Sequence, residues 1–138
     1  MTEEVRTVLG FDYGLRRIGV AVGQTITSTA RPLPGLAARD GIPNWIEIET
    51  LLGEWRPQRI IVGLPCHMDG NPHEITRLAS KFGRRLHGRF GVQVEYIDER
   101  LTSVEAESRI EKQDKGKKPS VDSVAAVIIL EDWLRQQG

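Results

Sequence analysis

The order of hydrophobic and polar positions predicts a chain that alternates between short strands and amphipathic helices. Runs that are apolar, alternating or rich in threonine, as is typical of strands, occur at residues 8–12, 18–23, 24–30, 59–65 and 92–97. Only a few residues link the first two runs, which predicts that these two strands form a β-hairpin. The segment at residues 31–35, with its two prolines, is expected to interrupt regular structure.

Apolar residues recur at helical spacing in the rest of the chain. One such stripe predicts a helix over residues 44–55, and a second predicts a helix over residues 74–87. Thr102 and Glu105 match a capping box, so a further helix is expected to start at Thr102. Ser120 is in place to cap a final helix over residues 121–136.

This succession of elements fits a single α/β domain over residues 1–138. A hairpin followed by strand–helix alternation implies a mixed sheet, here of five strands, with helices on its faces. A chain of 138 residues can bury a core without disulfides or structural metal. The single cysteine, Cys66, excludes an intrachain disulfide and a zinc site built from several cysteines.

Charge and hydropathy add only weak expectations about partners. The 19 Lys+Arg residues balance 19 Asp+Glu residues, and a net charge of +0 neither indicates nor excludes nucleic-acid binding, which depends on local clusters. The first residues lack the basic start and apolar run of a signal peptide, and no apolar stretch approaches the length of a membrane span. We therefore expect a cytoplasmic protein without a membrane partner.

Four carboxylates stand at positions where a sheet of this kind forms sites. Asp12 closes the first strand, Asp98 and Glu99 close the last, and Asp122 lies in the first turn of the final helix. The carboxyl ends of parallel strands share one edge, where gathered carboxylates repel one another unless a cation is present. Mg²⁺ suits such oxygen ligands. The alternative is that each is a solvated or capping residue, as Asp122 at a helix start would be without any metal.

Four sequence motifs, in order, resemble those of the YqgF family, also called RuvX. They span most of the chain, from about residue 8 to residue 133. The motifs occupy residues 12–22 (DYGLRRIGVAV), 63–65 with 68–70 (GLP and MDG), 98–102 with 105–106 (DERLT and EA), and 117–130. The resemblance implies a ribonuclease H-like fold with helices on both faces of the sheet, related to the Holliday junction resolvase RuvC.

The resemblance also implies a set of catalytic metal ligands. Asp12 matches the acidic residue of the family's first strand, and Asp122 matches that of its final helix. Glu99 is the expected middle ligand because its longer side chain reaches further, and Asp98 is the alternative. The implied cofactor is Mg²⁺ or Mn²⁺, with two ions expected.

The activity implied is metal-dependent hydrolysis of phosphodiester bonds, in the 5′-end maturation of pre-16S rRNA during ribosome biogenesis. The implied partner is structured RNA or a ribosomal precursor particle, and the oligomeric state is open. Three alternatives remain. They are a Holliday junction resolvase acting on DNA, a non-catalytic RNA-binding assembly factor, and a nucleotide-binding module, because the Asp-Tyr-Gly hairpin is also similar to the phosphate loop of actin-like ATPases.

Several cations are candidates for contact with substrate phosphates. The expected nucleic-acid-binding residues are Arg16, Arg17, Arg100, Lys115, Lys117 and Lys118. For the two arginines of the hairpin turn, a solvated turn is the alternative. A further basic stripe on the predicted helix at 74–87 contains Arg77, Lys81, Arg84 and Arg85. A solvated face is the favoured interpretation of that stripe, and contact with an RNA backbone is the alternative.

Overall fold

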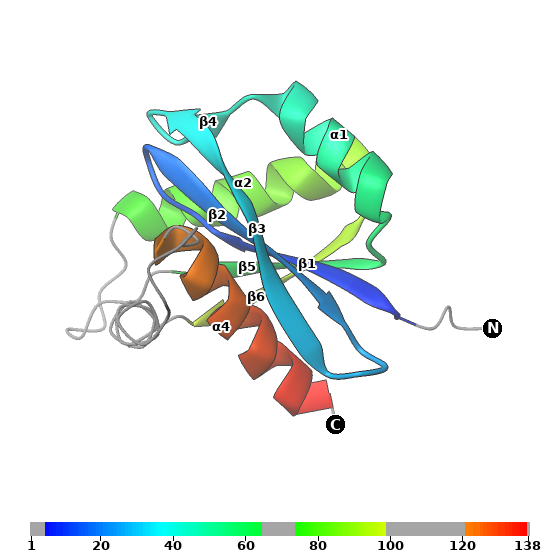
Figure 1. Cartoon of the computed structure of the whole chain (residues 1–138). Helices are drawn as coiled ribbons and strands as arrows, with labels where there is room; N and C mark the ends of the chain where they lie inside the picture. The colour runs from blue at the N-terminus through cyan, green and yellow to red at the C-terminus, as the bar shows by residue number, and fades with distance from the viewer. Residues whose placement is uncertain (1–4, 65–73, 99–120, 138) are drawn as a thin grey trace.

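The computed structural model describes residues 5–64, 74–98 and 121–137, without the side chains of residues 121 and 122. The elements in chain order are β1 (Thr7–Asp12), β2 (Arg17–Gln24), β3 (Thr29–Arg39), β4 (Ile42–Pro43), α1 (Trp45–Trp55), β5 (Arg59–Leu64), α2 (Glu74–Phe90), β6 (Gln93–Asp98) and α4 (Val121–Gln137). Figure 1 shows the sheet as a central layer, with α4 crossing one face and α1 and α2 on the other. The helix expected from Thr102 lies outside the described residues.

The sheet is mixed, as predicted, and its order is β4-β3-β2-β1-β5-β6. β1 pairs with β2 as an antiparallel hairpin, whereas β1, β5 and β6 run parallel. The described residues form six strands rather than the expected five. The additional strand is β4, which has only two residues and pairs with the end of β3. So short a strand carries no periodicity that a sequence pattern could reveal.

The prediction for the third strand was wrong. Residues 25–28 form a turn, and β3 then runs from Thr29 to Arg39, straight through the two prolines that were expected to interrupt structure. β2 pairs with one side of β3, while β4 covers only Ala38 and Arg39 on the other side. Most of the outer side of β3 is therefore an edge. Proline lacks an N–H donor, and at such an edge this donor is not needed for pairing.

The helices lie close to their predicted bounds. The side chain of Asn44 caps α1 by accepting a hydrogen bond from the Ile46 N–H at 3.0 Å. Arg56 ends that helix in the left-handed conformation, with φ 47°. α2 extends to Phe90, three residues beyond the predicted end at residue 87. Among the described residues, no helix has the length and apolar character that crossing a bilayer requires.

Strand alternation divides the buried residues into two cores, one on each face of the sheet. On the first face, α1 and α2 pack on strand residues that include Leu9, Phe11 and Val62. On the second face, α4 packs on Val8, Ala21 and Ile61. The prediction of helices on both faces is confirmed.

Gly10 allows α4 to approach the centre of the sheet closely. A Cβ atom built at Gly10 would lie 2.6 Å from Leu130 Cγ and 3.3 Å from the Ala126 carbonyl oxygen. Both neighbours belong to α4 and are fully buried. The absence of a side chain at this position therefore sets the distance between α4 and β1, the strand that ends at Asp12.

We expect Gly10→Ala to lower the free energy of unfolding by about 1–3 kcal/mol, because the added methyl group overpacks the interface with α4. Gly53→Ala is the matched control, since a Cβ atom at Gly53 would meet nothing within 4 Å. Gly53 lies inside α1, where alanine is favoured over glycine by about 1 kcal/mol. Urea denaturation checks both variants. Equal stability of the two would contradict the close approach described for Gly10.

Candidate functional site

The carboxyl ends of three parallel strands meet at one edge of the sheet. β1 ends at Asp12, β5 at Leu64 and β6 at Asp98. Asp12 is in register with Gly63, and Leu64 is in register with Asp98. The prediction that Asp12 and Asp98 lie at the same edge is therefore confirmed, with β5 between their strands.

Asp12 lies on the face of the sheet that α4 covers. Val8 packs in the α4 core and a Cβ at Gly10 would touch α4, so Asp12, two residues further along β1, shares that face. Asp12 is partly buried. Gly63 of β5 is in register with Asp12 on the same face, and Ile97 of β6 is in turn in register with Gly63. Gly63 has no side chain, so β5 contributes none to this face between Asp12 and Ile97.

Ser123 fixes the start of α4 beside the end of β1. Its hydroxyl accepts a hydrogen bond from the Val20 N–H at 3.3 Å and donates one to the Leu33 carbonyl at 2.8 Å. Val20 is in register with Phe11, the residue before Asp12. The backbone of Asp122, next to Ser123, is therefore held near the carboxyl end of β1. Sequence reasoning missed Ser123, although a serine directly before the apolar run VAAVIIL was a visible signal.

Asp98 lies on the opposite face of the sheet from Asp12. In β6, the Tyr96 hydroxyl donates to the Ser80 carbonyl of α2, whereas Glu95 accepts a hydrogen bond from the Trp133 indole of α4. Even-numbered residues of β6 therefore face α2, and Asp98 belongs to that set. Sequence reasoning placed Asp98 at the correct edge without resolving which face it occupies.

The three predicted metal ligands are only partly covered by the structure. Glu99 lies outside the described residues, and for Asp122 only the backbone is described. Among the described residues, no group of three or more His, Cys, Asp or Glu side chains could hold a metal ion. The structure thus fixes the position of Asp12 and the start of α4, and the joint ligand set stays a prediction.

Two of the predicted phosphate-binding cations lie at the same edge as Asp12. Both are exposed: Arg16 ends the connection between β1 and β2, and Arg17 is the first residue of β2. Gly14 makes that connection tight, because a Cβ atom there would lie 2.5 Å from the Arg17 carbonyl oxygen. The other predicted cations, Arg100, Lys115, Lys117 and Lys118, lie outside the described residues.

Tyr13 anchors the segment that follows Asp12. The side chain is buried, and its hydroxyl donates a hydrogen bond of 2.8 Å to the Gly41 carbonyl in the turn between β3 and β4. Its ring lies 5.2 Å from the ring of Phe82 in α2. Burial raises the pKa of the Tyr13 phenol, and the charge of Arg85 partly opposes this rise. Sequence reasoning missed this role, because the partner lies 28 residues away in the chain.

We expect Tyr13→Phe to lower the free energy of unfolding by about 1 kcal/mol, since the Gly41 carbonyl loses its hydrogen bond in a buried place. The raised pKa of Tyr13 means that the folded state favours the neutral phenol. The stabilisation of the folded state by the neutral Tyr13 phenol is therefore complete below about pH 10, and it is lost as the pH rises further and the phenol ionises. The difference in the free energy of unfolding between Tyr13→Phe and the wild type should shrink above that pH.

Tyr96→Phe is the matched control for this prediction. The Tyr96 hydroxyl also donates to a carbonyl, at 3.2 Å, but the residue is 40% exposed, so water replaces the lost bond. Chemical denaturation between pH 7 and pH 11 checks both variants. An effect of Tyr96→Phe as large as that of Tyr13→Phe would contradict the anchoring role of Tyr13.

Comparison with protein families places nearly the whole chain in one group. Residues 6–136 match the family described as "RuvX: Holliday junction resolvase". A protein of Aeromonas salmonicida named "Putative pre-16S rRNA nuclease" is 54% identical over 138 residues, covering 96% of each chain. A protein of the same name from Escherichia coli O1:K1 / APEC is 55% identical over 136 residues, covering 94% of this chain and 96% of its own.

Solved structures of junction resolvases share the fold at low sequence identity. Thermus thermophilus RuvC in complex with Holliday junction substrate matches with a TM-score of 0.59 and 17% identity, covering 96% of this chain and 95% of that chain. The yeast mitochondrial Holliday junction resolvase matches with a TM-score of 0.58 and 12% identity, covering 99% of this chain and 81% of that chain. This likeness confirms the predicted ribonuclease H-like fold.

Proposed function

The chain belongs to the RuvX family of nucleases, and on this premise we propose that it is a divalent-metal-dependent ribonuclease that matures the 5′ end of pre-16S rRNA. The relatives at more than 50% identity over almost the full chain support this substrate through their name. The proposed setting is the cytoplasm, where the partner is structured precursor rRNA or a ribosomal precursor particle.

The observation that carries the proposal is the position of Asp12 at the carboxyl end of a central parallel strand, on the face where α4 begins. Sites in sheets of this kind form at that edge. The Ser123 hydrogen bonds bring the backbone of Asp122 to the same place from the far end of the chain. We propose Asp12, Asp122 and Glu99 as the catalytic residues and metal ligands.

Glu99 is proposed over Asp98 because of the face that Asp98 occupies. Asp98 lies on the α2 face and Asp12 on the α4 face, with the sheet between them. In extended chain, each residue presents its side chain to the face opposite to that of its neighbour. The position after Asp98 is therefore the one suited to join Asp12, and a glutamate supplies the longer reach.

Carboxylate oxygens fit the proposed metals by their chemistry. Mg²⁺ and Mn²⁺ prefer oxygen ligands, and Mg²⁺ is typically held by a few carboxylates together with substrate phosphate. Gly63, in register with Asp12, contributes no side chain to the place where such an ion would lie. Two ions, when bound, would supply the positive charge that stabilises the attacking and leaving oxygens of a phosphodiester.

Exposed arginines at the same edge are proposed to hold the substrate. Arg16 ends the connection that follows Asp12, and Arg17 begins β2, so a phosphate bound there would lie close to the scissile bond. Arg100, Lys115, Lys117 and Lys118 are proposed as further phosphate contacts. These side chains position the strand, and they carry no sequence information by themselves.

Cleavage of a Holliday junction is the second candidate, and it is favoured by the family description and by the fold shared with RuvC. A single experiment separates it from rRNA maturation. The purified protein is given a precursor-rRNA fragment and a four-way DNA junction, each with Mg²⁺, with Mn²⁺, or with EDTA. We expect RNA cleavage with either metal, none with EDTA, and an intact junction.

The other outcomes of that experiment decide the alternatives. Junction cleavage with intact RNA would make the protein a resolvase. RNA binding without cleavage of either substrate in any metal would instead make it a non-catalytic assembly factor. RNA cleavage that persists in EDTA would contradict the proposed metal dependence, because removing the cations removes the charge that the carboxylates are there to hold.

A further inference from the structure

The outer surface of α2 carries a line of cations that the proposed metal site does not use. After Glu74, every exposed residue of this helix is basic apart from Gly88. Neighbouring cations stand mostly three or four residues apart, so they lie along one side of the helix. At about 1.5 Å of rise per residue, this line of cations is about 18 Å long. We call it the α2 stripe, and its Lys and Arg residues are Arg77, Lys81, Arg84, Arg85 and Arg89.

Most of the charge of the α2 stripe is not neutralised within the described residues. α2 contains one carboxylate, Glu74, and this residue pairs with Arg77. In the part of the chain that the structure describes, Lys81, Arg84 and Arg85 form no ion pair. Arg89 lies 4.3 Å over the ring centre of Trp45, a contact that orients the guanidinium group and leaves its charge in place.

The two helices on this face of the sheet carry opposite charges. α1 exposes Glu47, Glu49 and Glu54 and contains no Lys or Arg residue. The net charge of +0 therefore does not describe the surface of α2, where positive charge dominates. A polyanion is attracted to α2 and repelled by α1, so it is oriented along the α2 stripe.

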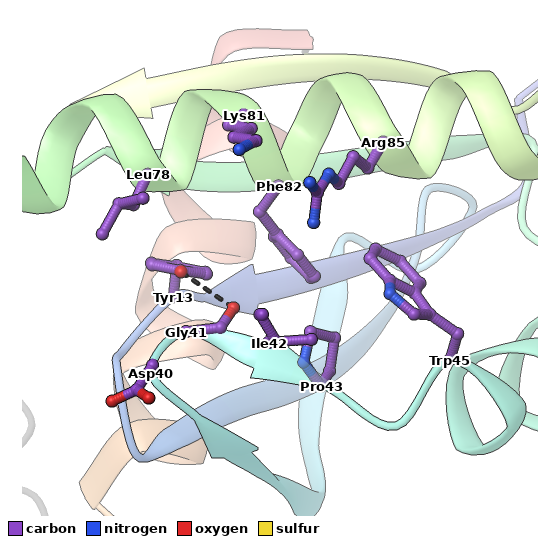
Figure 2. A pocket seen from close by; sticks show the side chains of 10 residues that line it. All are labelled: Tyr13, Asp40, Gly41, Ile42, Pro43, Trp45, Leu78, Lys81, Phe82 and Arg85. Carbon is purple, nitrogen blue, oxygen red and sulfur yellow. Dashed lines mark hydrogen bonds between the residues drawn. The ribbon is translucent and has the colours of Figure 1, made fainter.

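The α2 stripe lies near the candidate site. α2 begins on the side of the molecule where α4 also begins (Figure 1). Lys81 and Arg85 border a small recess beside Tyr13, the residue that follows Asp12 (Figure 2). Figure 2 shows Arg85 directed from α2 toward this recess, while the carboxylate of Asp40 points away from both cations. Since α2 and α4 cover opposite faces of the sheet, a nucleic acid on the α2 stripe reaches Asp12 around the strand edge.

The α2 stripe offers charge without a free aromatic ring. Phe82 is buried, and Trp45 is covered by Arg89. The Tyr96 ring is held against α2 by the hydrogen bond of its hydroxyl to the Ser80 carbonyl. Unpaired bases are generally bound by stacking on aromatic side chains, whereas double-stranded RNA is bound through its phosphates and its shape. The α2 stripe therefore fits a duplex better than an unpaired strand.

A membrane surface does not fit this helix. Helices that lie on membranes insert an apolar face between the lipids. The apolar face of α2 is instead buried in the core against the sheet, where Ala79, Phe82 and Leu86 pack. Only the cationic face is left for a partner, and a partner held by its phosphates alone suits that face.

We propose that the α2 stripe binds the phosphate backbone of a double-stranded RNA stem that flanks the cleaved strand, without reading its sequence. Lys81, Arg84 and Arg85 contact phosphates directly. The choice of RNA rests on the proposed function. Binding at the α2 stripe needs no metal ion, so it can be measured apart from cleavage.

The salt dependence of RNA binding in EDTA tests the proposal, because each phosphate contact adds about one unit to the slope of log K against log salt concentration. The probe is an RNA stem-loop, and its affinity is measured by fluorescence anisotropy over a series of KCl concentrations. We expect Lys81→Gln, Arg84→Gln and Arg85→Gln each to weaken binding about fivefold and to reduce the slope by about 1. The triple variant should weaken binding about 100-fold and reduce the slope by about 3.

Arg135→Gln is the matched control for these variants. Arg135 is exposed in the last turn of α4, on the other face of the sheet and far from the strand edge where that helix begins. This variant should bind the stem-loop with the affinity and slope of the wild type. Glutamine is a good helix former, so each variant is expected to fold, which thermal unfolding checks. The single variants test the proposal even if the triple variant unfolds.

Three results would overturn the proposal. The first is an unchanged affinity and slope in the Lys81, Arg84 and Arg85 variants. The second is equal affinity for the stem-loop and for an unpaired oligoribonucleotide of the same length. The third is equally effective displacement of the stem-loop by polyglutamate of the same charge, since the α2 stripe would then hold any polyanion. Asp12→Asn should bind the stem-loop as the wild type does, so failure of the nuclease proposal would be seen separately.

Discussion

Asp12→Asn is expected to reduce RNA cleavage by about 10³-fold or more while the protein folds and binds RNA as the wild type does. The substitution keeps the shape of the side chain and removes the negative charge of the central proposed ligand. A metal ion supplies several kcal/mol of charge stabilisation. Because each 1.36 kcal/mol changes a rate tenfold, a loss of about 4 kcal/mol gives the expected factor.

Asp132→Asn is the matched control for the Asp12 variant. Asp132 lies in α4, away from the strand edge, and its exposed ion pair with Arg135 contributes little to stability. Single-turnover cleavage, thermal unfolding and RNA binding in EDTA are measured for both variants. Cleavage by Asp12→Asn at the wild-type rate would remove the proposed mechanism. A loss of folding would show instead that Asp12 has a structural role.

Much of the fold follows from periodicity along the chain. β1, β2 and β5 are buried on both faces, so their apolar runs are continuous and bounded by polar residues. The apolar residues of α1 and α2 recur at helical spacing because one side of each helix is buried against the sheet. β3 could not be predicted in this way, because its prolines are compatible with a strand only at a sheet edge. Whether a strand lies at an edge depends on pairing between distant segments.

The candidate site was predictable to the level of the strand edge and no further. The sequence places Asp12 at the end of a strand, and parallel pairing brings that end beside those of β5 and β6. Contacts across long stretches of sequence supply the rest. Ser123 bonds to Val20, 103 residues away, and Tyr13 bonds to Gly41. No local pattern encodes such contacts, since Ser123 and Tyr13 alone look like ordinary polar residues and their partners are backbone groups of distant segments.

The second large expected effect is a contrast in cleavage between variants of the neighbouring residues Asp98 and Glu99, which are expected to lie on opposite faces of the sheet. Glu99→Gln is expected to reduce cleavage by about 10²-fold or more, because it removes a proposed ligand of the ion that Asp12 would hold. Asp98→Asn should change cleavage by less than about fivefold, because Asp98 lies on the α2 face, with the sheet between it and Asp12. Each substitution is isosteric and removes one charge, so each controls for the other.

The dependence of cleavage on metal concentration gives this contrast a second readout. If Glu99 binds the ion, Glu99→Gln should raise the Mg²⁺ concentration needed for half-maximal cleavage, and excess Mn²⁺ should restore part of the rate, because a weakened site is refilled by mass action. Asp98→Asn should leave that concentration unchanged. The reverse order, with Asp98→Asn the more damaging variant, would mean that the chain turns before its middle ligand. The strand would then present Asp98, rather than its neighbour, to Asp12.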